Sequence, residues 1–255
     1  MNRKRKLALL WSMVSIAILC FLVGLIYPKL PLTAIMGSQS LDQQQQAFVE
    51  FMVPKIDLAN EQVFALRKQI LLVVDKAAHK KQLTEVEKRF LKQTAAAYNI
   101  ADFNIDRPAS MTELLKRVDI VPTSLVLAQS ADESGWGTSH FAQEEHNFFG
   151  QHCFVKGCGI IPNGVAPGTF EIAKFNDAQD AINYYLYNLN TNASYIDFRN
   201  ERARLRAQGV PLTGAALAPC LEGYSVLGST YIGMVNSIIL AHGFSQYDKQ
   251  YQVVK

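Results

Sequence analysis

The sequence predicts a mostly helical α+β protein with a small β-rich lobe, preceded by an N-terminal transmembrane helix. Apolar residues recur at three- and four-residue steps over most of the 255-residue chain, which is the spacing of amphipathic helices. Over residues 150–175 that spacing is lost, and glycines, prolines and two cysteines surround short apolar bursts that favour a β-hairpin. Residues 7–27 form an uncharged apolar run that is long enough to cross a bilayer.

Residues 1–27 are predicted to be a cytoplasmic basic stub followed by a transmembrane signal anchor. Basic residues occupy positions 3–6, and the apolar run behind them would span roughly 30 Å as a helix. Basic residues on this side place the N-terminus in the cytoplasm and the rest of the chain across the membrane. The alternative is a cleaved signal peptide, because small residues follow at 32–38. The apolar run is longer than the roughly 7 to 15 residues usual in such peptides.

Charge and composition exclude several classes of function. The whole chain has a formal charge of +3, but without residues 1–27 it keeps 21 basic and 22 acidic residues. Such a near-neutral body does not offer the basic face that nucleic-acid binding requires. Hydrophobic residues make up 49% of the chain and charged residues 18%, which is typical of a folded protein. We expect neither a nucleic-acid partner nor a cofactor.

Helices are expected along most of the remaining chain. Residues 28–42 form a short linker, and the domain predicted for residues 43–255 begins with a helical pattern. The expected helical segments are 42–56, 61–78, 80–98, 112–117, 122–133, 140–145, 176–189, 195–208, 215–221 and 229–242. Thr84 and Glu87 have the spacing of a capping box. Gly135 is the expected stop of the helix that begins at residue 122.

The four cysteines predict one disulfide. Cys153 and Cys158 are separated by four intervening residues in a glycine-containing loop of an exported domain, which favours a disulfide between them. Cys20 lies in the apolar run as a small hydrophobic residue, and Cys220 is left over. Three histidines near the loop make zinc an alternative, but their spacing matches no standard site, so we expect no metal. These histidines are His140, His146 and His152.

The most informative segment surrounds Glu133 at the end of a predicted helix. The helix dipole disfavours an ionised carboxylate at this end, and burial against Trp136 and the nearby phenylalanines would disfavour it further. Both effects raise the pKa of a carboxyl group, as an acid that protonates a glycosidic oxygen requires. Gln129 lies one turn back on the same face, within reach of a hydrogen bond to this carboxyl. The alternative is a glutamate that merely caps or solvates the helix end.

This segment resembles a known family. The matching residues are 127–129 (Leu-Ala-Gln), 133–137 (Glu-Ser-Gly-Trp-Gly) and 147–150 (Asn-Phe-Phe-Gly), with weaker matches at 48–54, 175–185, 192–195 and 223–231. They resemble the muramidase-like glucosaminidase domain of glycoside hydrolase family 73 (mannosyl-glycoprotein endo-beta-N-acetylglucosaminidase-like), and most closely its Bax-type bacterial proteins. The resemblance covers about residues 45–243, apart from an extra helical stretch at about 62–110.

The resemblance implies a lysozyme-like helical lobe, a small β-rich lobe and a cleft between them for a glycan strand. It implies hydrolysis after N-acetylglucosamine in peptidoglycan, with Glu133 as proton donor and Tyr195 at the cleft. The residues expected to contact substrate are Gln129, Trp136, Gly137, Phe149 and Tyr224. The expected location is the bacterial inner membrane, crossed once, with the catalytic domain in the periplasm. The sequence does not specify an oligomeric state.

Several of these side chains also have an ordinary structural interpretation. Tyr195 is also typical of a core aromatic residue, and Trp136 of a residue that is partly structural. Phe148 and Phe149 are more typical of packing beneath the catalytic helix than of ligand contact. A run of arginines favours a solvated helix face over contacts with acidic stem peptides. These arginines are Arg199, Arg202, Arg204 and Arg206.

The chain departs from the family at the second catalytic carboxylate. Many family members carry a second glutamate in the β-lobe, but no acid lies between Cys153 and Phe170 here. Glu171 is a displaced candidate for that role, or a solvated strand residue. Without it, the acetamido group of the substrate could assist, or an intramolecular attack could give an anhydro product, as in lytic transglycosylases. A weakly active peptidoglycan-binding module is the third alternative.

Overall fold

One long helix, α3 (Leu41–Ala78), runs along the domain and contacts elements from most of the chain. The computed structural model describes residues 41–161 and 170–251. The predicted anchor at 1–27 and almost all of the linker therefore lie outside the described residues. Within the described ranges, no helix is both long and apolar enough to cross a membrane.

The described part of the chain is mostly helical with a small sheet, as the sequence predicts. After α3, its elements in order are α4 (Glu85–Ala97), α5 (Pro108–Arg117), α6 (Thr123–Ser134), α7 (His140–Glu145), β1 (His152–Cys153), β2 (Gly159–Ile160), β3 (Glu171–Ala173), α8 (Ala178–Thr191), η1 (Ala193–Tyr195), α9 (Ile196–Ala207), α10 (Gly214–Leu217), η2 (Ala218–Tyr224), α11 (Ser229–Ala241) and η3 (Phe244–Tyr247). The predicted capping box is confirmed, because Glu87 accepts the Thr84 amide at 2.7 Å and donates its own to the Thr84 hydroxyl oxygen at 3.3 Å.

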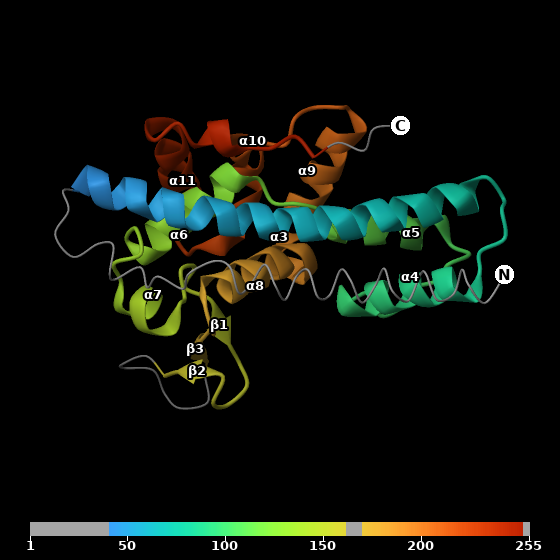
Figure 1. Ribbon diagram of the computed structural model, residues 1–255, viewed down its shortest axis with the longest axis horizontal. Helices are drawn as coiled ribbons and strands as arrows, with labels where there is room; N and C mark the ends of the chain where they lie inside the picture. Colours follow the sequence, from blue (N-terminus) through green and yellow to red (C-terminus); the bar gives the residue numbers. More distant parts are fainter. Residues whose placement is uncertain (1–40, 162–169, 252–255) are drawn as a thin grey trace, which may run out of the picture. The chain divides into compact units, whose positions relative to one another are not determined.

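The buried helix α6 forms the centre of the domain. Figure 1 shows α6 and α11 near the N-terminal half of α3, and the helices α10 and α11 and the short η3 also contact α6. Leu125, Val126, Leu127 and Ala128 have no exposed surface, so this part of α6 is buried on every side. A helix buried on all sides is held by packing rather than by its own propensity. Its last residues are thereby fixed in position.

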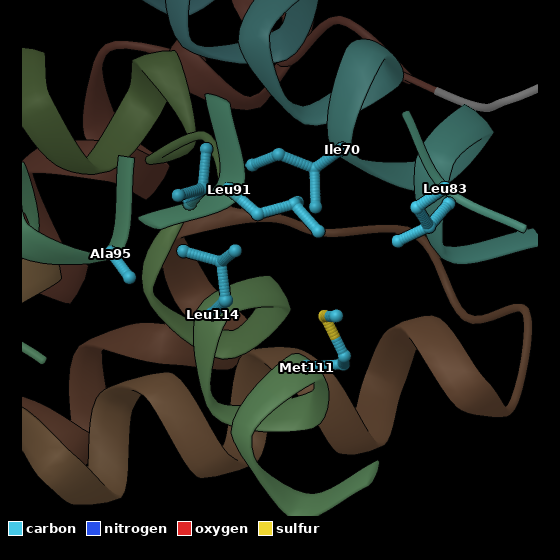
Figure 2. Close-up of a cluster of buried hydrophobic side chains, with 7 residues drawn as sticks. Ile70, Leu83, Leu91, Ala95, Met111 and Leu114 are labelled. Atoms are coloured by element: carbon cyan, nitrogen blue, oxygen red, sulfur yellow. The ribbon is translucent and has the colours of Figure 1, made fainter. Parts of the chain in front are cut away.

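The extra helical stretch has a small core of its own. Figure 2 shows Ile70 of α3, Leu91 of α4 and Leu114 of α5 converging in this cluster. These three side chains are fully buried, and Leu83 and Met111 extend the cluster. Burial of a large aliphatic side chain contributes roughly 1.5 to 3 kcal/mol. The cluster therefore attaches α4 and α5 firmly to the C-terminal half of α3.

The β-lobe is a three-stranded antiparallel sheet in the order β1-β3-β2. Cys153 pairs with Glu171 across β1 and β3, and Gly159 pairs with Ala173 across β2 and β3. A Cβ atom on Gly159 would lie 1.8 Å from the Ile172 carbonyl oxygen, so only glycine fits there. The lobe is small, and these close backbone contacts fix how its three strands pair.

The arginine run does not form a solvated helix face, so that prediction is wrong for two of its members. Arg199 and Arg202 are buried on α9. The Arg202 guanidinium donates to the carbonyl oxygens of Lys116 and Ile120 and to the Asn190 side chain. Burial lowers the pKa of Arg202 to about 9, although the charge of Asp119 opposes this effect. These arginines hold helices together and are not available to stem peptides.

Candidate active site

Glu133 lies in the last turn of α6, as predicted, and reaches solvent. The helix ends at Gly135, whose φ of 56° is the left-handed conformation that glycine adopts without a steric penalty. Trp136 follows with a φ of 59°, a strained value for a residue with a large side chain. The chain therefore turns sharply directly after Glu133. The carboxyl group is left at the open end of a buried helix.

A line of hydrogen bonds leads from the core to Glu133. The Tyr185 hydroxyl on α8 donates to Gln129 Oε1, and Gln129 Nε2 donates to the Tyr231 hydroxyl oxygen at 2.8 Å. The Tyr231 hydroxyl on α11 faces the Glu133 carboxyl group, near enough to act on its pKa as a hydrogen-bond donor. Gln129 was expected to reach this carboxyl directly; in the structure it is fully buried and the contact passes through Tyr231.

Four tyrosines surround the acid and form what we call the tyrosine cluster. Its members are Tyr185, Tyr195, Tyr224 and Tyr231. Tyr224 stacks on Tyr231 at 5.5 Å between ring centroids, with an angle of 9° between the rings. Burial is the main cause that raises the pKa of each tyrosine, and the charge of Glu133 raises all four further. These hydroxyls are therefore neutral near pH 7 and serve as hydrogen-bond donors.

The turn at 147–150 forms the second wall beside Glu133. The Asn147 side chain donates to the Gln151 and Ala173 carbonyl oxygens at 2.9 and 2.8 Å, which ties this turn to β3. A Cβ atom on Gly150 would lie 3.4 Å from Glu133 Oε2, so the backbone passes close to the carboxyl. The Tyr224 hydroxyl donates to the Phe149 carbonyl oxygen at 3.0 Å. The segments that the sequence analysis singled out thus converge on one carboxyl group.

The environment raises the pKa of Glu133, as an acid catalyst requires. Desolvation by the surrounding protein is the largest cause, even though the side chain reaches solvent, and the nearby Asp132 charge raises the pKa further. The hydrogen bond from Tyr231 acts in the opposite direction. Burial also raises the pKa of Asp132. Glu133 therefore holds its proton to a higher pH than a glutamate in water.

The large aromatic residues of the motif lie in the core. The Trp136 ring is half-buried and packs at 4.7 Å from the His242 ring and 5.9 Å from the Phe48 ring. Phe148 and Phe149 are almost fully buried, and Phe149 stacks on Tyr185 at 4.2 Å. Phe149 thus packs beneath the site, and its carbonyl oxygen rather than its ring faces Tyr224.

Two further residues expected at the site are an expected substrate contact, Gly137, and the residue expected at the cleft with Glu133, Tyr195. Gly137 is buried, and its amide donates to the Ser134 hydroxyl oxygen at 2.8 Å. Tyr195 is also buried, and its hydroxyl faces Asn188. Tyr195 nevertheless lies close enough to Glu133 for that charge to raise its pKa. Its placement fits both of its interpretations, a core aromatic residue and a residue at the cleft.

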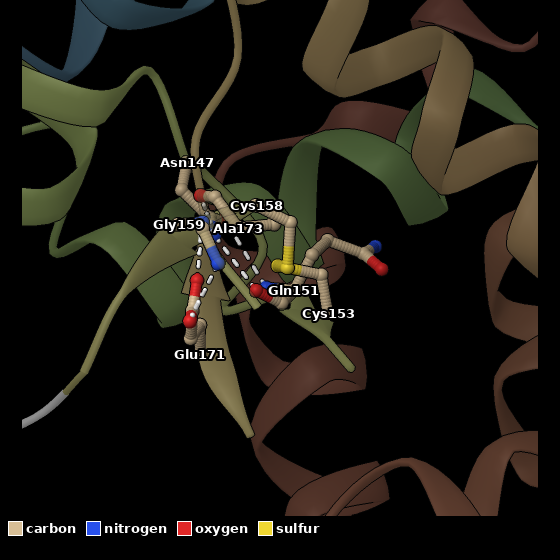
Figure 3. Close-up of a disulfide and its surroundings, with 8 residues drawn as sticks. Asn147, Gln151, Cys153, Cys158, Gly159, Glu171 and Ala173 are labelled. Carbon is tan, nitrogen blue, oxygen red and sulfur yellow. Dashed lines mark hydrogen bonds between the residues drawn. A yellow bond between two sulfur atoms is a disulfide. The ribbon is translucent and has the colours of Figure 1, made fainter. Parts of the chain in front are cut away.

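Glu171 holds the tip of the β-lobe. Its two carboxylate oxygens accept the Gly157 and Gly159 amides, each at 2.8 Å, and these bonds lower the pKa of Glu171 (Figure 3). The predicted disulfide is confirmed, because Cys153 and Cys158 are bonded and close the same loop. Glu171 thus has a structural partner for each oxygen.

Among the described residues, one group of side chains has ligand atoms close enough together to hold a metal ion, and it joins Cys153, Cys158 and Glu171. Both sulfur atoms are in the disulfide and both carboxylate oxygens accept amides, so this grouping offers no free ligand. The predicted free cysteine, Cys220, is confirmed as unpaired and half-buried.

The sequence did not predict the roles of Tyr231, Tyr185 and Asp132. Tyr231 ends the weak family match at 223–231, and Tyr185 ends the one at 175–185. Each sits where an apolar residue would maintain the helical spacing, and a tyrosine at such a position needs a buried hydrogen-bond partner. This requirement indicates from the sequence that each tyrosine has a buried hydrogen-bond partner, but it does not indicate which residue the partner is.

The site thus consists of an exposed acid at a helix end, enclosed by tyrosines beside a small β-lobe. The family model described as mannosyl-glycoprotein endo-beta-N-acetylglucosaminidase matches residues 109–251. The chain therefore belongs to this glucosaminidase family, as its motifs suggested. It is also 32% identical over 188 residues to "Protein bax" of Escherichia coli (strain K12), a match that covers 74% of this chain and 66% of that protein. No solved structure matches the chain.

Proposed function

We propose that this protein is a peptidoglycan hydrolase that cleaves glycan strands after N-acetylglucosamine, with Glu133 as the general acid. The observation that carries the proposal is the setting of Glu133. Its carboxyl reaches solvent from the end of a buried helix, desolvation raises its pKa, and Tyr231 holds it in place. A general acid needs a raised pKa and an open path to the leaving oxygen.

The family of this chain, together with the chain's similarity to "Protein bax", supports a glycan substrate. Which bond of the glycan is cleaved is part of the proposal. The tyrosine cluster supports it further, because neutral hydroxyl groups can hydrogen-bond a sugar without adding charge beside the acid. Glu133, the cluster and the Gly150 turn together would form the floor of the cleft.

Lytic transglycosylation is the second candidate, and the position of Glu171 favours it. A hydrolase with two carboxylates uses the second one as a base or nucleophile. Here both Glu171 oxygens accept loop amides at 2.8 Å. A reaction with one acid and an intramolecular nucleophile needs no such group. A weakly active peptidoglycan-binding module is the remaining alternative and predicts wall binding without cleavage.

We also propose that the apolar run at 7–27 anchors the protein in the bacterial inner membrane, with residues 43–255 in the periplasm. The basic residues at 3–6 and the predicted and observed disulfide support this topology. A reporter fused to the C-terminus would be active in the periplasm and would remain in the membrane fraction. Release of the protein in soluble form would instead indicate a cleaved signal peptide.

The test is digestion of purified peptidoglycan by the full chain in detergent, followed by mass analysis of the fragments. Glu133→Gln should abolish cleavage, and Glu144→Gln, which alters an exposed glutamate on α7, should not. Reducing N-acetylglucosamine ends would identify a glucosaminidase, and anhydromuramic ends a transglycosylase. Unchanged cleavage by Glu133→Gln would overturn the assignment of the acid.

A further inference from the structure

The hydrogen bonds that reach Glu133 have a fixed direction. A glutamine amide oxygen only accepts and its nitrogen only donates. Because the Tyr185 hydroxyl bonds to Gln129 Oε1, it must be the donor, and Gln129 Nε2 must then donate to the Tyr231 oxygen. The Tyr231 oxygen is thereby an acceptor in this bond, and its own hydrogen is free to point at the Glu133 carboxyl.

The ring of Tyr231 is also held in place. Tyr231 is buried, and Tyr224 stacks on it nearly parallel, at 5.5 Å between ring centroids. The Tyr224 hydroxyl is in turn bonded to the Phe149 carbonyl oxygen, so this ring is fixed as well. The stack on Tyr224 thus fixes the position of the Tyr231 ring, and the hydrogen bond from Gln129 determines the direction of the Tyr231 hydroxyl hydrogen.

We infer that Tyr231 is a positioning residue that donates its hydroxyl hydrogen to Glu133, and that Gln129 directs this donation. The inference rests on the proposed function, because it concerns the acid of that reaction. When Glu133 gives its proton to the leaving oxygen, a negative charge develops on the carboxylate. A donor that already points at this carboxylate stabilises the charge without reorganisation. Gln129 thus acts on the reaction without touching the substrate.

The other groups around Glu133 do not duplicate this donor. The titratable groups that interact with it are Asp132, Tyr185, Tyr195, Tyr224 and Tyr231. Asp132 raises the pKa of Glu133, whereas the bond from Tyr231 lowers it. The Tyr185 hydroxyl is bonded to Gln129 and the Tyr224 hydroxyl to the Phe149 carbonyl oxygen, and the Tyr195 hydroxyl faces Asn188. Removing the Tyr231 hydroxyl should therefore raise the pKa of Glu133.

The test is to titrate Glu133 by ¹³C NMR of the side-chain carboxyl in the full chain in detergent, with Glu133→Gln assigning the signal. Tyr231→Phe should raise its pKa by roughly one to two units, the equivalent of a hydrogen bond to a charged group. The high-pH limb of kcat/KM should move upward equally, because activity requires the protonated acid. The maximal kcat should fall roughly tenfold to a hundredfold.

The role of Gln129 is tested by a double-mutant cycle. Gln129→Met should shift the pKa of Glu133 in the same direction as Tyr231→Phe but by less, and should add nothing in the Tyr231→Phe background. Tyr187→Phe, which alters an exposed tyrosine of α8, should leave titration and activity unchanged. If Gln129→Met does not fold, Tyr231→Phe alone decides the question.

Two results would overturn the inference. One is a Glu133 pKa that stays constant or falls in Tyr231→Phe. The other is a shift caused by Gln129→Met that is equal in both backgrounds, which would mean that Gln129 acts independently of Tyr231. The titration needs no substrate, so it separates this inference from the proposed function. Cleavage retained by Glu133→Gln would overturn the function while the hydrogen-bond direction could still be confirmed.

Discussion

Neutralising Asp119 tests the buried charge network that holds the scaffold behind the site. The Asp119 carboxylate is 2% exposed and accepts hydrogen bonds from Arg206 at 2.5 and 2.6 Å. Arg67 lies 3.4 Å away, and Arg202 bonds to the Asp119 carbonyl oxygen. Asp119→Asn keeps the size of the side chain and removes its charge. It leaves three buried or half-buried arginines with one anion fewer.

The expected loss follows from the cost of an unpaired buried charge. Removing one partner of a buried ion pair costs roughly 3 to 5 kcal/mol. Domains of this size lose roughly 2 to 4 °C in Tm for each kcal/mol, so Tm should fall by roughly 6 to 20 °C. The cost is enhanced here because burial already lowers the pKa of Arg67 and of Arg202, and the Asp119 charge is what opposes this effect in both.

The contribution of Asp119 to the free energy of unfolding depends on pH, and the direction follows from its pKa. Burial alone would raise the pKa of Asp119, but the arginines more than offset it and the net pKa is lowered. A carboxyl with a lowered folded pKa contributes stability above its unfolded pKa of about 3.9, and the contribution is lost as pH falls through the folded pKa. The penalty of Asp119→Asn should therefore be full at neutral pH and shrink in acid.

The assay is thermal and urea unfolding of the full chain in detergent, monitored by circular dichroism at several pH values. Glu201→Gln is the control, because Glu201 pairs with Arg204 at the surface of α9, the helix that carries Arg202 and Arg206, and its loss should change Tm by about 2 °C or less. A loss below about 1 kcal/mol for Asp119→Asn at neutral pH would refute the reasoning. So would a penalty that grows as the pH falls.

Two further substitutions probe the site itself. Glu171→Gln should lower cleavage far less than Glu133→Gln does. Trypsin should cut this variant faster at Lys156, because the loop amides lose an acceptor. An equal loss of activity in both variants would make Glu171 catalytic. Gly150→Ala should cost roughly 1 to 2 kcal/mol through its φ of +61° and also lower kcat, since its Cβ would lie 3.4 Å from Glu133 Oε2. Gly209→Ala carries similar strain at φ +67° with open space around it, and kcat should stay normal there.

Local patterns in the sequence predicted most of the helices. The three- and four-residue spacing at 42–56 and 61–78 continues in one helix, α3, which runs through Pro54 without ending there. The last predicted segment, 229–242, is matched by α11. Such features depend on neighbours within one or two turns, so a single sequence carries them. The β-lobe was predicted from its glycines and cysteines for the same reason.

The buried arginines could not be predicted from spacing. Arg202 has no exposed surface because its partners are the Lys116 and Ile120 carbonyl oxygens, 86 and 82 residues earlier in the chain. A charged residue in a helical pattern is normally solvated. Only the assembled fold supplies enough acceptors to make burial of the guanidinium acceptable. This information is not present in any local window.

The candidate site shows the same division. Glu133 was predicted from its helix end and its motif, which are local. The contact between Gln129 and Tyr231 spans 102 residues, and it determines which group reaches the acid. Phe149 was expected near substrate, but its stacking on Tyr185 requires knowledge of where α8 lies. The position of Glu133 at the helix end was therefore predictable, whereas its hydrogen-bond environment was not.

The environment of Glu133 also bears on the second half of the reaction. Glu171 is committed to the Gly157 and Gly159 amides, and its lowered pKa keeps it ionised in that role. The surrounding tyrosines have raised pKa values, so at neutral pH they hold their protons and are poor bases. A water molecule beside Glu133 would find few groups able to activate it.

A nucleophile that belongs to the substrate avoids this difficulty. An acetamido oxygen or a sugar hydroxyl is neutral, needs little or no prior deprotonation, and is held by the same contacts that bind the strand. Under the proposed function, the protein then supplies one tuned acid and a set of neutral donors. On this argument the choice between hydrolysis and transglycosylation depends on which substrate group the cleft holds near the anomeric carbon. A glycan that lacks the acetamido group would remain a substrate only in the second case.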